Sequence, residues 1–296
     1  MSGMLRNFEH TFFTTEKFIL NDTFFESKDI FFAGYSGYLK LEEAEERFVN
    51  LYKPKEYVIQ NWGKDIEDEI NEVTGFKDWE ITNKSSNLKN VISSWRCRYL
   101  ANQMRIDFEK LGNIKYDLVY NLRPDFFCFD QIDHNLARAS KKNINSVYVP
   151  YDWDFKSLNP NAIGDIMAFG SPEAMNKYYS LYLYAREYRD KKIGNHAETL
   201  LGYHFESQKI NREFCPRNVA REYPYSEPEG FYLWESKLSK DEVLNALKID
   251  NKFLVDQKPK QNQPYQNNFI NFIKKINSFL KIIFFKKLIN FIRKYF

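Results

Sequence analysis

The feature that most constrains the fold is an alternation of short apolar runs with longer amphipathic ones. Glu56–Gln60 has the length and the β-branched and aromatic content of a strand. Leu41–Tyr52 places its apolar side chains on one side of a helix and its glutamates elsewhere. Strands that alternate with helices are typical of α/β proteins, so the sequence predicts an α/β fold.

Other segments extend this pattern along the chain. Strands are also predicted at residues 29–34, 116–122, 145–150 and 165–170, and helices at 8–20, 91–111, 172–188 and from 196 onward. Ser2–Asn7 is predicted to be a loop, and residues 61–89 form a polar stretch without a clear period.

The pattern also predicts the domain organisation. The chain has 296 residues, of which 43% are hydrophobic and 28% charged, so a large core is possible. Residues 1–211 are predicted to be one α/β domain and residues 212–256 a mixed extension. Residues 257–267 form a polar linker with two prolines, and residues 268–296 form a separate tail.

The tail differs from the body in charge. Seven cations and no acid follow Gln266, which leaves 36 basic against 40 acidic residues in the rest of the chain. The body is therefore not a nucleic-acid binder by charge. Phe, Ile and Leu alternate with Lys and Asn over residues 268–296, which predicts an amphipathic helix on an anionic membrane surface. The alternative is a helix docked on a partner or on the body of the protein.

Cysteine usage and hydropathy bear on the compartment. Cys97, Cys128 and Cys215 lie far apart and form no Cys-x-x-Cys pair, which argues against a disulfide framework or a structural zinc site and fits a reducing cytoplasm. The N-terminal residues lack the apolar region of a signal peptide, and no uncharged apolar run is long enough to span a membrane. We therefore expect a cytoplasmic protein.

Two strings carry candidate site residues at strand ends. Arg123 and Asp125 follow the strand at 116–122, at the edge where ligands bind in open α/β sheets. Arg123 could bind phosphate oxygens and Asp125 a divalent cation, or the two could form a structural ion pair. Asp165 lies beside Gly164, before the strand and helix that Ser171 separates. It could contribute to a site or be a solvated aspartate near a capped helix.

A third string contains His196 and Glu198. Two residues apart, they do not share a helical face, so a metal-binding pair is not expected. Glu198 could be a general base near an acceptor hydroxyl, and His196 is predicted to begin a helix. The sequence contains no Gly-x-Ser-x-Gly, Walker, Gly-x-Gly-x-x-Gly or His-Glu-x-x-His motif, so hydrolase, NTPase, dinucleotide and zinc-protease functions lack support.

The order of the strings suggests a family. It runs Ser-Gly-x-x-Arg-Asn-Phe, Asp-Ile-Phe-Phe, Tyr-Asp-Leu-Val-x-x-x-Arg-Pro-Asp, Gly-Asp-x-x-Ala-Phe-Gly-Ser-x-x-x-Met and His-x-Glu-x-Leu-Leu, within residues 2–205. This order resembles a family of poorly characterised bacterial sugar transferases found among lipooligosaccharide and capsule genes. These are similar to nucleotide-diphospho-sugar transferases of the GT-A fold.

The resemblance implies a Rossmann-like mixed sheet flanked by helices, and roles for individual residues. Arg6 would face the nucleotide or its phosphates. Asp125, with Arg123 beside it, would hold Mn²⁺ or Mg²⁺, and Asp165 and Glu198 would line the acceptor side. Two features depart from the family: the string here is Arg-Pro-Asp where Asp-x-Asp is expected, and the apolar first strand that precedes Ser-Gly is lacking.

The sequence therefore predicts a glycosyltransferase at the inner face of the cytoplasmic membrane. Its partners would be a nucleotide sugar, a lipooligosaccharide or capsule glycan as acceptor, and an anionic membrane surface. One alternative is transfer of another nucleotide-activated group, for example to a lipid head group. The other is a non-catalytic peripheral membrane protein with a degenerate transferase fold.

Overall fold

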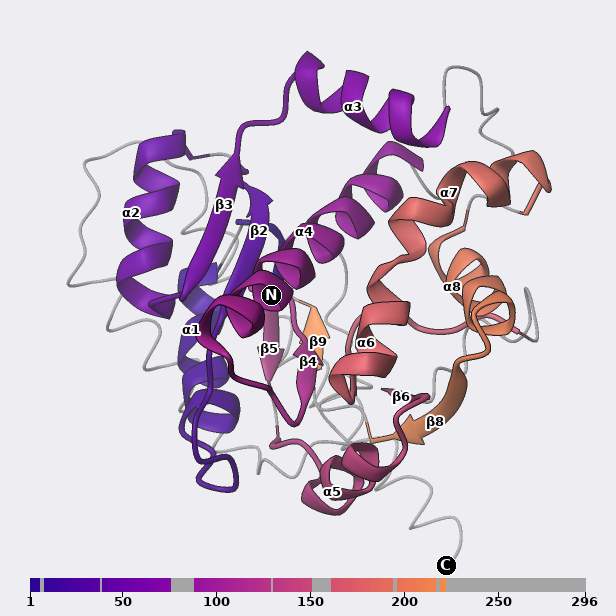
Figure 1. The fold of residues 1–296 in the computed structure, drawn as a ribbon. Helices are drawn as coiled ribbons and strands as arrows, with labels where there is room; N and C mark the ends of the chain where they lie inside the picture. Colours follow the sequence, from indigo (N-terminus) through magenta and orange to yellow (C-terminus); the bar gives the residue numbers. More distant parts are fainter. Residues whose placement is uncertain are drawn as a thin grey trace, which may run out of the picture. The chain divides into compact units, whose positions relative to one another are not determined.

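The computed structural model describes residues 1–5, 8–37, 39–75, 88–128, 130–150, 161–193, 196–216 and 219–221. The chain divides into two compact units, Met1–Val219 and Ala220–Phe296. The second unit contributes two of the described residues, so the fold below is that of the first unit (Figure 1).

Short strands and helices alternate along this unit (Figure 1). The strands are β1 (Ser2–Met4), β2 (Phe31–Tyr35), β3 (Glu56–Gln60), β4 (Val119–Asn121), β5 (Phe126–Cys128), β6 (Ser146–Pro150), β7 (Ala168–Gly170) and β8 (Asn211–Cys215), with β9 (Val219–Arg221) at the unit boundary. The helices are α1 (Phe8–Thr15), the π-helix η1 (Glu16–Leu20), α2 (Leu41–Tyr52), α3 (Lys64–Thr74), α4 (Leu88–Gly112), α5 (His134–Lys142), α6 (Pro172–Tyr179), α7 (Leu181–Asp190) and α8 (Ala197–Ser207).

Two sheets meet at β1 and β4. In the first, β2 pairs in parallel with β1 and β3. In the second, β7 runs antiparallel between β4 and β6, and β6 pairs in parallel with β8. The strand orders are β1-β2-β3 in the first sheet and β4-β7-β6-β8 in the second. The amide of Ser2 donates to the carbonyl of Leu122 over 3.2 Å, which places β1 beside the end of β4. The predicted α/β fold is confirmed, with parallel and antiparallel pairs.

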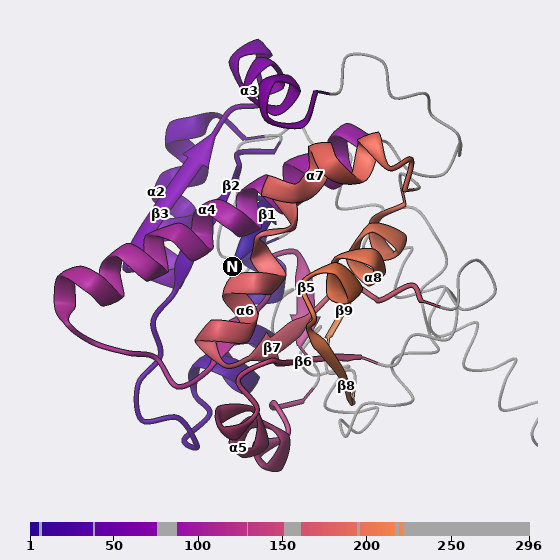
Figure 2. The same cartoon turned by 45° about the vertical axis from the view of Figure 1, so that its right-hand side comes forward.

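Helices cover both faces of these strands, because successive side chains of a strand point to opposite sides. Ala33 of β2 and Val147 of β6 join one apolar cluster with α3, α4, α6, α7 and α8. Their neighbours Phe32 and Tyr148 point the other way, into clusters with α2 and α5 respectively. Helix α4 runs across β1, β2 and β3, as Figures 1 and 2 show.

The structure corrects some of the predicted elements. Ser2–Met4 was predicted as part of a loop and is strand β1; the Ser-Gly pair resembles a turn locally, but its backbone pairs with β2. The helix predicted at 172–188 is divided at Ser180, whose hydroxyl donates to the carbonyl of Lys177 over 2.8 Å. Helices α3 and α5 were not predicted. Residues 41–52 and 56–60 match α2 and β3 residue for residue.

The predicted C-terminal organisation lies largely outside the described residues. The predicted boundary after residue 211 falls within β8, which pairs with β6, and the first compact unit continues to Val219. The linker at 257–267 and the tail at 268–296 are not among the described residues. Among those that are, no helix combines the length and the apolar character that crossing a bilayer requires.

Candidate active site

The candidate site begins where β1 and β4 end. Gly3 has φ of +132°, a conformation that residues with a side chain rarely adopt. A Cβ atom on Gly3 would lie 3.9 Å from Nε of Arg123 and 4.0 Å from Cδ of Pro124. These are ordinary van der Waals distances, so the positive φ of Gly3, and not a lack of space, favours glycine where β1 passes the Arg-Pro-Asp turn that follows β4.

Arg123 and Asp125 form a two-point ion pair within that turn. Nε and Nη2 of Arg123 donate to the two carboxylate oxygens of Asp125 over 2.9 and 2.8 Å. Asp125 is 2% exposed, and the guanidinium of Arg123 lies 4.8 Å from the centre of the Phe126 ring. The hydroxyl of Thr11, on α1, donates to the carbonyl of Pro124, which fixes the turn to that helix.

This geometry bears on the two roles predicted for the pair. Both oxygens of Asp125 accept from Arg123, so the carboxylate is already neutralised by its neighbour. The described part of the chain contains no cluster of three or more His, Cys, Asp and Glu side chains that could hold a metal ion. The role of Asp125 as a metal ligand stays a prediction. Arg6 lies outside the described residues.

Asp165 is held by an arginine that the sequence analysis missed. Nη2 of Arg98, on α4, donates to the carboxylate and to the backbone carbonyl of Asp165, each over 2.9 Å. Burial would raise the pKa of Asp165, but the guanidinium groups of Arg98 and Arg123 together hold that pKa below its ordinary value. Asp165 is therefore ionised near neutral pH.

His196 and Glu198 complete the group at the start of α8. Nδ1 of His196 lies 3.1 Å from a carboxylate oxygen of Glu198, and both side chains are largely buried. Burial lowers the pKa of His196, while Asp165 acts in the opposite direction. The amide of Ile163 donates to the carbonyl of Glu198 over 3.0 Å, which joins the start of α8 to the segment that leads into Asp165.

The structure thus brings together strings that are far apart in the sequence. Asp165 lies within electrostatic reach of Arg98, Arg123 and His196, and each of these comes from a different segment. The sequence signal for Arg98 was its position three residues after Trp95, on the apolar side of a predicted helix. The Arg98 guanidinium lies 4.3 Å from the centre of the Trp95 ring, and the Arg98 side chain is fully buried.

A second signal was missed in the sequence. Asp152-Trp153-Asp154 begins two residues after Pro150, the end of β6, and has the Asp-x-Asp pattern that the Arg-Pro-Asp string lacks. These residues lie outside the described part of the chain. An apolar run that ends in two carboxylates one residue apart was the signal that could have found them.

Polar side chains also gather at the carboxyl ends of β2 and β3. The hydroxyl of Ser36 donates to the side-chain carbonyl of Asn61 over 2.7 Å, and Nη1 of Arg96 donates to that of Gln60 over 2.9 Å. Trp62 is 41% exposed beside them. This edge adjoins the site in strand order, and carboxyl ends of parallel strands are where α/β proteins bind ligands.

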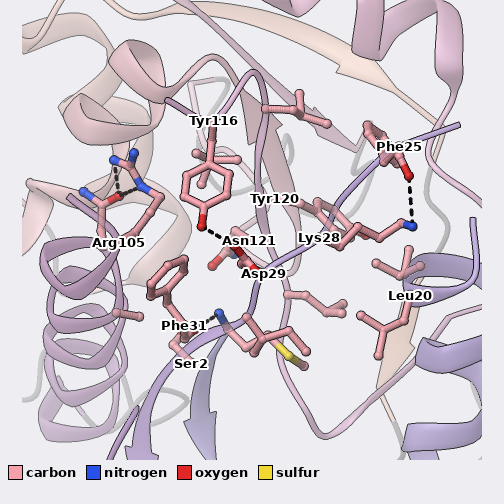
Figure 3. A pocket seen from close by; sticks show the side chains of 18 of the residues that line it. Ser2, Leu20, Phe25, Lys28, Asp29, Phe31, Arg105, Tyr116, Tyr120 and Asn121 are labelled. Atoms are coloured by element: carbon pink, nitrogen blue, oxygen red, sulfur yellow. Dashed lines mark hydrogen bonds between the residues drawn. The ribbon is translucent and has the colours of Figure 1, made fainter. Parts of the chain in front are cut away.

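A cavity of about 160 Å³ lies near the opposite ends of β2 and β4 (Figure 3). Residues 29–31 and 118–122 line it, together with parts of η1 and α4. The hydroxyl of Tyr116 donates to Asp29 over 2.6 Å at its edge, and the amino group of Met1 donates to the carbonyl of Phe31 over 2.6 Å. Burial lowers the pKa of that amino group to about 5.

No family model and no curated protein sequence matches the chain. Among solved structures, the chain is similar to core-mannan synthase A from Aspergillus fumigatus in its Mn/GDP form. The two are 12% identical, the similarity covers 75% of this chain and 73% of that chain, and the TM-score is 0.39. A likeness of this size does not bear on the chemistry of the present chain.

Proposed function

We propose that the protein is a glycosyltransferase that moves a sugar from a nucleotide-sugar donor to a hydroxyl group of a glycan. The observation that carries the proposal is that Asp165 interacts with Arg123, which follows β4, and with His196, which pairs with Glu198 over 3.1 Å. In such a site an arginine can bind the diphosphate of the donor, and carboxylates can bind and deprotonate the acceptor hydroxyl group. Glycosyl transfer requires both.

The donor side is assigned to the arginines. When the bond from the sugar anomeric carbon to the diphosphate breaks, negative charge grows on the leaving phosphate oxygen. A guanidinium stabilises that charge through paired N–H groups. Arg123 is 17% exposed in its side chain, so it can meet a ligand while it stays paired with Asp125. Arg6, which follows β1 in the sequence, is proposed to act on the same phosphates.

The acceptor side is assigned to the two carboxylates. The acceptor oxygen bonds to the anomeric carbon as its proton leaves, and Glu198 is proposed to take that proton. Asp165 is a poor base, because its pKa is held below the ordinary value. An ionised carboxylate is a hydrogen-bond acceptor only, so Asp165 is proposed to orient the acceptor hydroxyl group.

A divalent cation does not fit the described residues, because both oxygens of Asp125 are bound by Arg123 and no cluster of ligands surrounds them. Dependence on Mn²⁺ or Mg²⁺ remains a proposal, and the sequence offers Asp152 and Asp154 as further candidate ligands.

The acceptor is proposed to be a lipooligosaccharide or capsule glycan at the inner face of the cytoplasmic membrane. The support is the resemblance of the ordered strings and the basic tail at 268–296. A non-catalytic protein with a degenerate transferase fold is the second candidate. The observation that favours it is that Asp125 and Asp165 are each paired with an arginine, as structural ion pairs would be.

The test compares the wild type with Glu198→Gln and Glu187→Gln. Glu187 is a matched control, since it lies on a neighbouring helix and pairs with Lys191 at the surface. Nucleotide sugars are screened by thermal shift, and release of nucleoside diphosphate is then measured with the one that stabilises the wild type. We expect Glu198→Gln to keep the thermal shift and to lose turnover by about 100-fold, the contribution of a general base.

Glu187→Gln should match the wild type in both measurements. If no nucleotide sugar stabilises the wild type, the non-catalytic candidate replaces the transferase. If Glu198→Gln binds and turns over normally, another group takes the proton.

A further inference from the structure

Arg98 is a charged side chain whose burial needs an explanation. It is fully buried in the middle of α4, and only its Nη2 makes hydrogen bonds, both to Asp165. Within the described part of the chain, Nε and Nη1 of Arg98 have no hydrogen-bond partner. Unpaired donors on a buried cation are costly, and an apolar side chain of similar size is often at least as stabilising as a buried ion pair.

The contact between Arg98 and Asp165 has a more defined geometry than the neutralisation of two charges requires. One nitrogen of Arg98 binds the side chain and the backbone carbonyl of the same residue, which fixes the carboxylate relative to its own main chain. The Trp95 ring lies 4.3 Å from the guanidinium and limits its movement. The contact fixes one carboxylate oxygen of Asp165, the Oδ2 atom.

We propose that Arg98 is a positioning residue, which holds the carboxylate of Asp165 in one orientation so that it receives a hydrogen-bond donor. This rests on the proposed function, in which that donor is the hydroxyl group of a sugar acceptor. A substrate that presents an ether or carbonyl oxygen at this position would leave the carboxylate unpaired and would be rejected.

Several other groups interact electrostatically with Asp165. Arg123 comes from the turn after β4, His196 from the start of α8, and Tyr178 from α6. The positive charge of Arg123 is partly balanced by its ion pair with Asp125, which weakens its effect on Asp165. Arg98 differs from these groups in its contact, because its Nη2 donates two hydrogen bonds to Asp165.

The experiment compares three variants of the full chain. Arg98→Met removes charge and hydrogen bonds, and Arg98→Lys keeps the charge but not the planar group that the Trp95 ring holds. Arg105→Met is the matched control, because Arg105 is also buried on α4 and pairs with Glu109, Asn102 and Asn176 instead. The Asp165 carboxyl group is titrated by carbon NMR, and kcat and KM are measured against pH.

The expected results separate charge from position. Arg98→Met raises the pKa of Asp165 and moves the acid limb of the kcat profile to higher pH, and Arg105→Met leaves both unchanged. Arg98→Lys leaves the pKa of Asp165 low but lowers kcat by about 100-fold, the cost of a misplaced group, with KM for the donor unchanged.

Two results would overturn the proposal. One is an Asp165 titration in Arg98→Met that equals that of Arg105→Met. The other is a kcat of Arg98→Lys that equals the wild type. Because the titration needs no turnover, it tests the role of Arg98 even if the chain transfers no sugar. If Arg98→Met does not fold, the kcat of Arg98→Lys decides. If the protein shows no activity, the carboxyl carbon shift of Asp165 in Arg98→Lys, compared with the wild type at the same pH, decides instead.

Discussion

At the scale of single residues, arginines organise the buried charge of this protein. Arg98, Arg105 and Arg123 each bind a carboxylate with little access to solvent. A buried ion pair gains little net stability, yet the loss of one partner leaves an uncompensated charge. Substitutions at these pairs should therefore affect stability as well as any activity.

Asp125→Asn gives the clearest test of this cost. Asp125 is 2% exposed and both its oxygens accept from Arg123, so the amide would lose one charge-assisted hydrogen bond and the negative charge that faces the guanidinium. We expect the free energy of unfolding to fall by about 2–4 kcal/mol. Urea unfolding of the variant against the wild type measures this. Asp117→Asn is the control, because Asp117 is 76% exposed in its side chain and pairs with Lys141 at the surface. Equal stability of both variants would contradict the structural role.

A buried histidine should make stability depend on pH. His204 is fully buried, with Tyr188 at its Nδ1 and the carbonyl of Lys177 at its Nε2, and burial lowers its pKa from 6.5 to about 4. Below pH 6.5 the unfolded chain binds a proton at His204, while the folded chain does not bind it until about pH 4. The contribution to stability is complete above this window. It is lost as pH falls through it, by up to about 1.4 kcal/mol per pH unit.

The measurement is urea unfolding on both sides of that window, for the wild type and His204→Asn. The wild type should lose more stability than the variant as pH falls. Equal slopes for the two chains would show that His204 is accessible to protons in the folded state.

At the scale of elements, the sequence predicts those whose apolar pattern is complete within the segment. Residues 41–52 and 56–60 are such segments, and they match α2 and β3. Helix α3 was missed because its apolar face consists of Ile66 and Ile70 in an otherwise charged stretch. Strand β1 was missed because three residues acquire strand geometry only from their neighbours in the sheet.

The candidate site also contains residues that the local sequence predicts and residues that depend on tertiary contacts. Asp165, Glu198, Arg123 and Asp125 could be found from their places at the ends of predicted elements. Their partners could not, because the pairing of Arg98 with Asp165 joins residues 67 positions apart and depends on how α4 lies on the sheet.

An apolar segment added before Met1 tests whether the cavity beside this residue can hold an extension of β1. Residues 29–31 and 118–122 line two sides of that cavity, and the amino group of Met1 is buried next to it. A short apolar segment added before Met1 should occupy the cavity and stabilise the protein, since each large buried side chain is worth about 1.5–3 kcal/mol. Thermal unfolding and hydrogen exchange at the amide of Phe31 measure the effect. A glycine–serine segment of equal length is the control, and equal melting temperatures for both extended chains would contradict the prediction.

At the scale of the whole molecule, the charge is divided between body and tail. Seven cations and no acid follow Gln266, whereas the rest of the chain carries 36 basic and 40 acidic residues. A slightly acidic body has no electrostatic attraction to an anionic membrane, so any such attraction must come from the tail. A basic tail would suit a transferase with a lipid-linked acceptor, because the tail would hold the catalytic body at the membrane in which the acceptor is anchored.

Deletion of residues 266–296 tests that division. Each cation near an anionic leaflet contributes about 1 kcal/mol, and the apolar side chains between the lysines add a part that salt does not screen. The full chain should therefore sediment with anionic vesicles more than with neutral ones, and high salt should weaken its binding without abolishing it. The truncated chain should remain in solution and keep transfer to a soluble acceptor analogue, while transfer to a lipid-linked acceptor falls. Equal sedimentation of the two chains would remove the tail from membrane binding. A truncated chain that unfolds would show instead that the tail stabilises the fold.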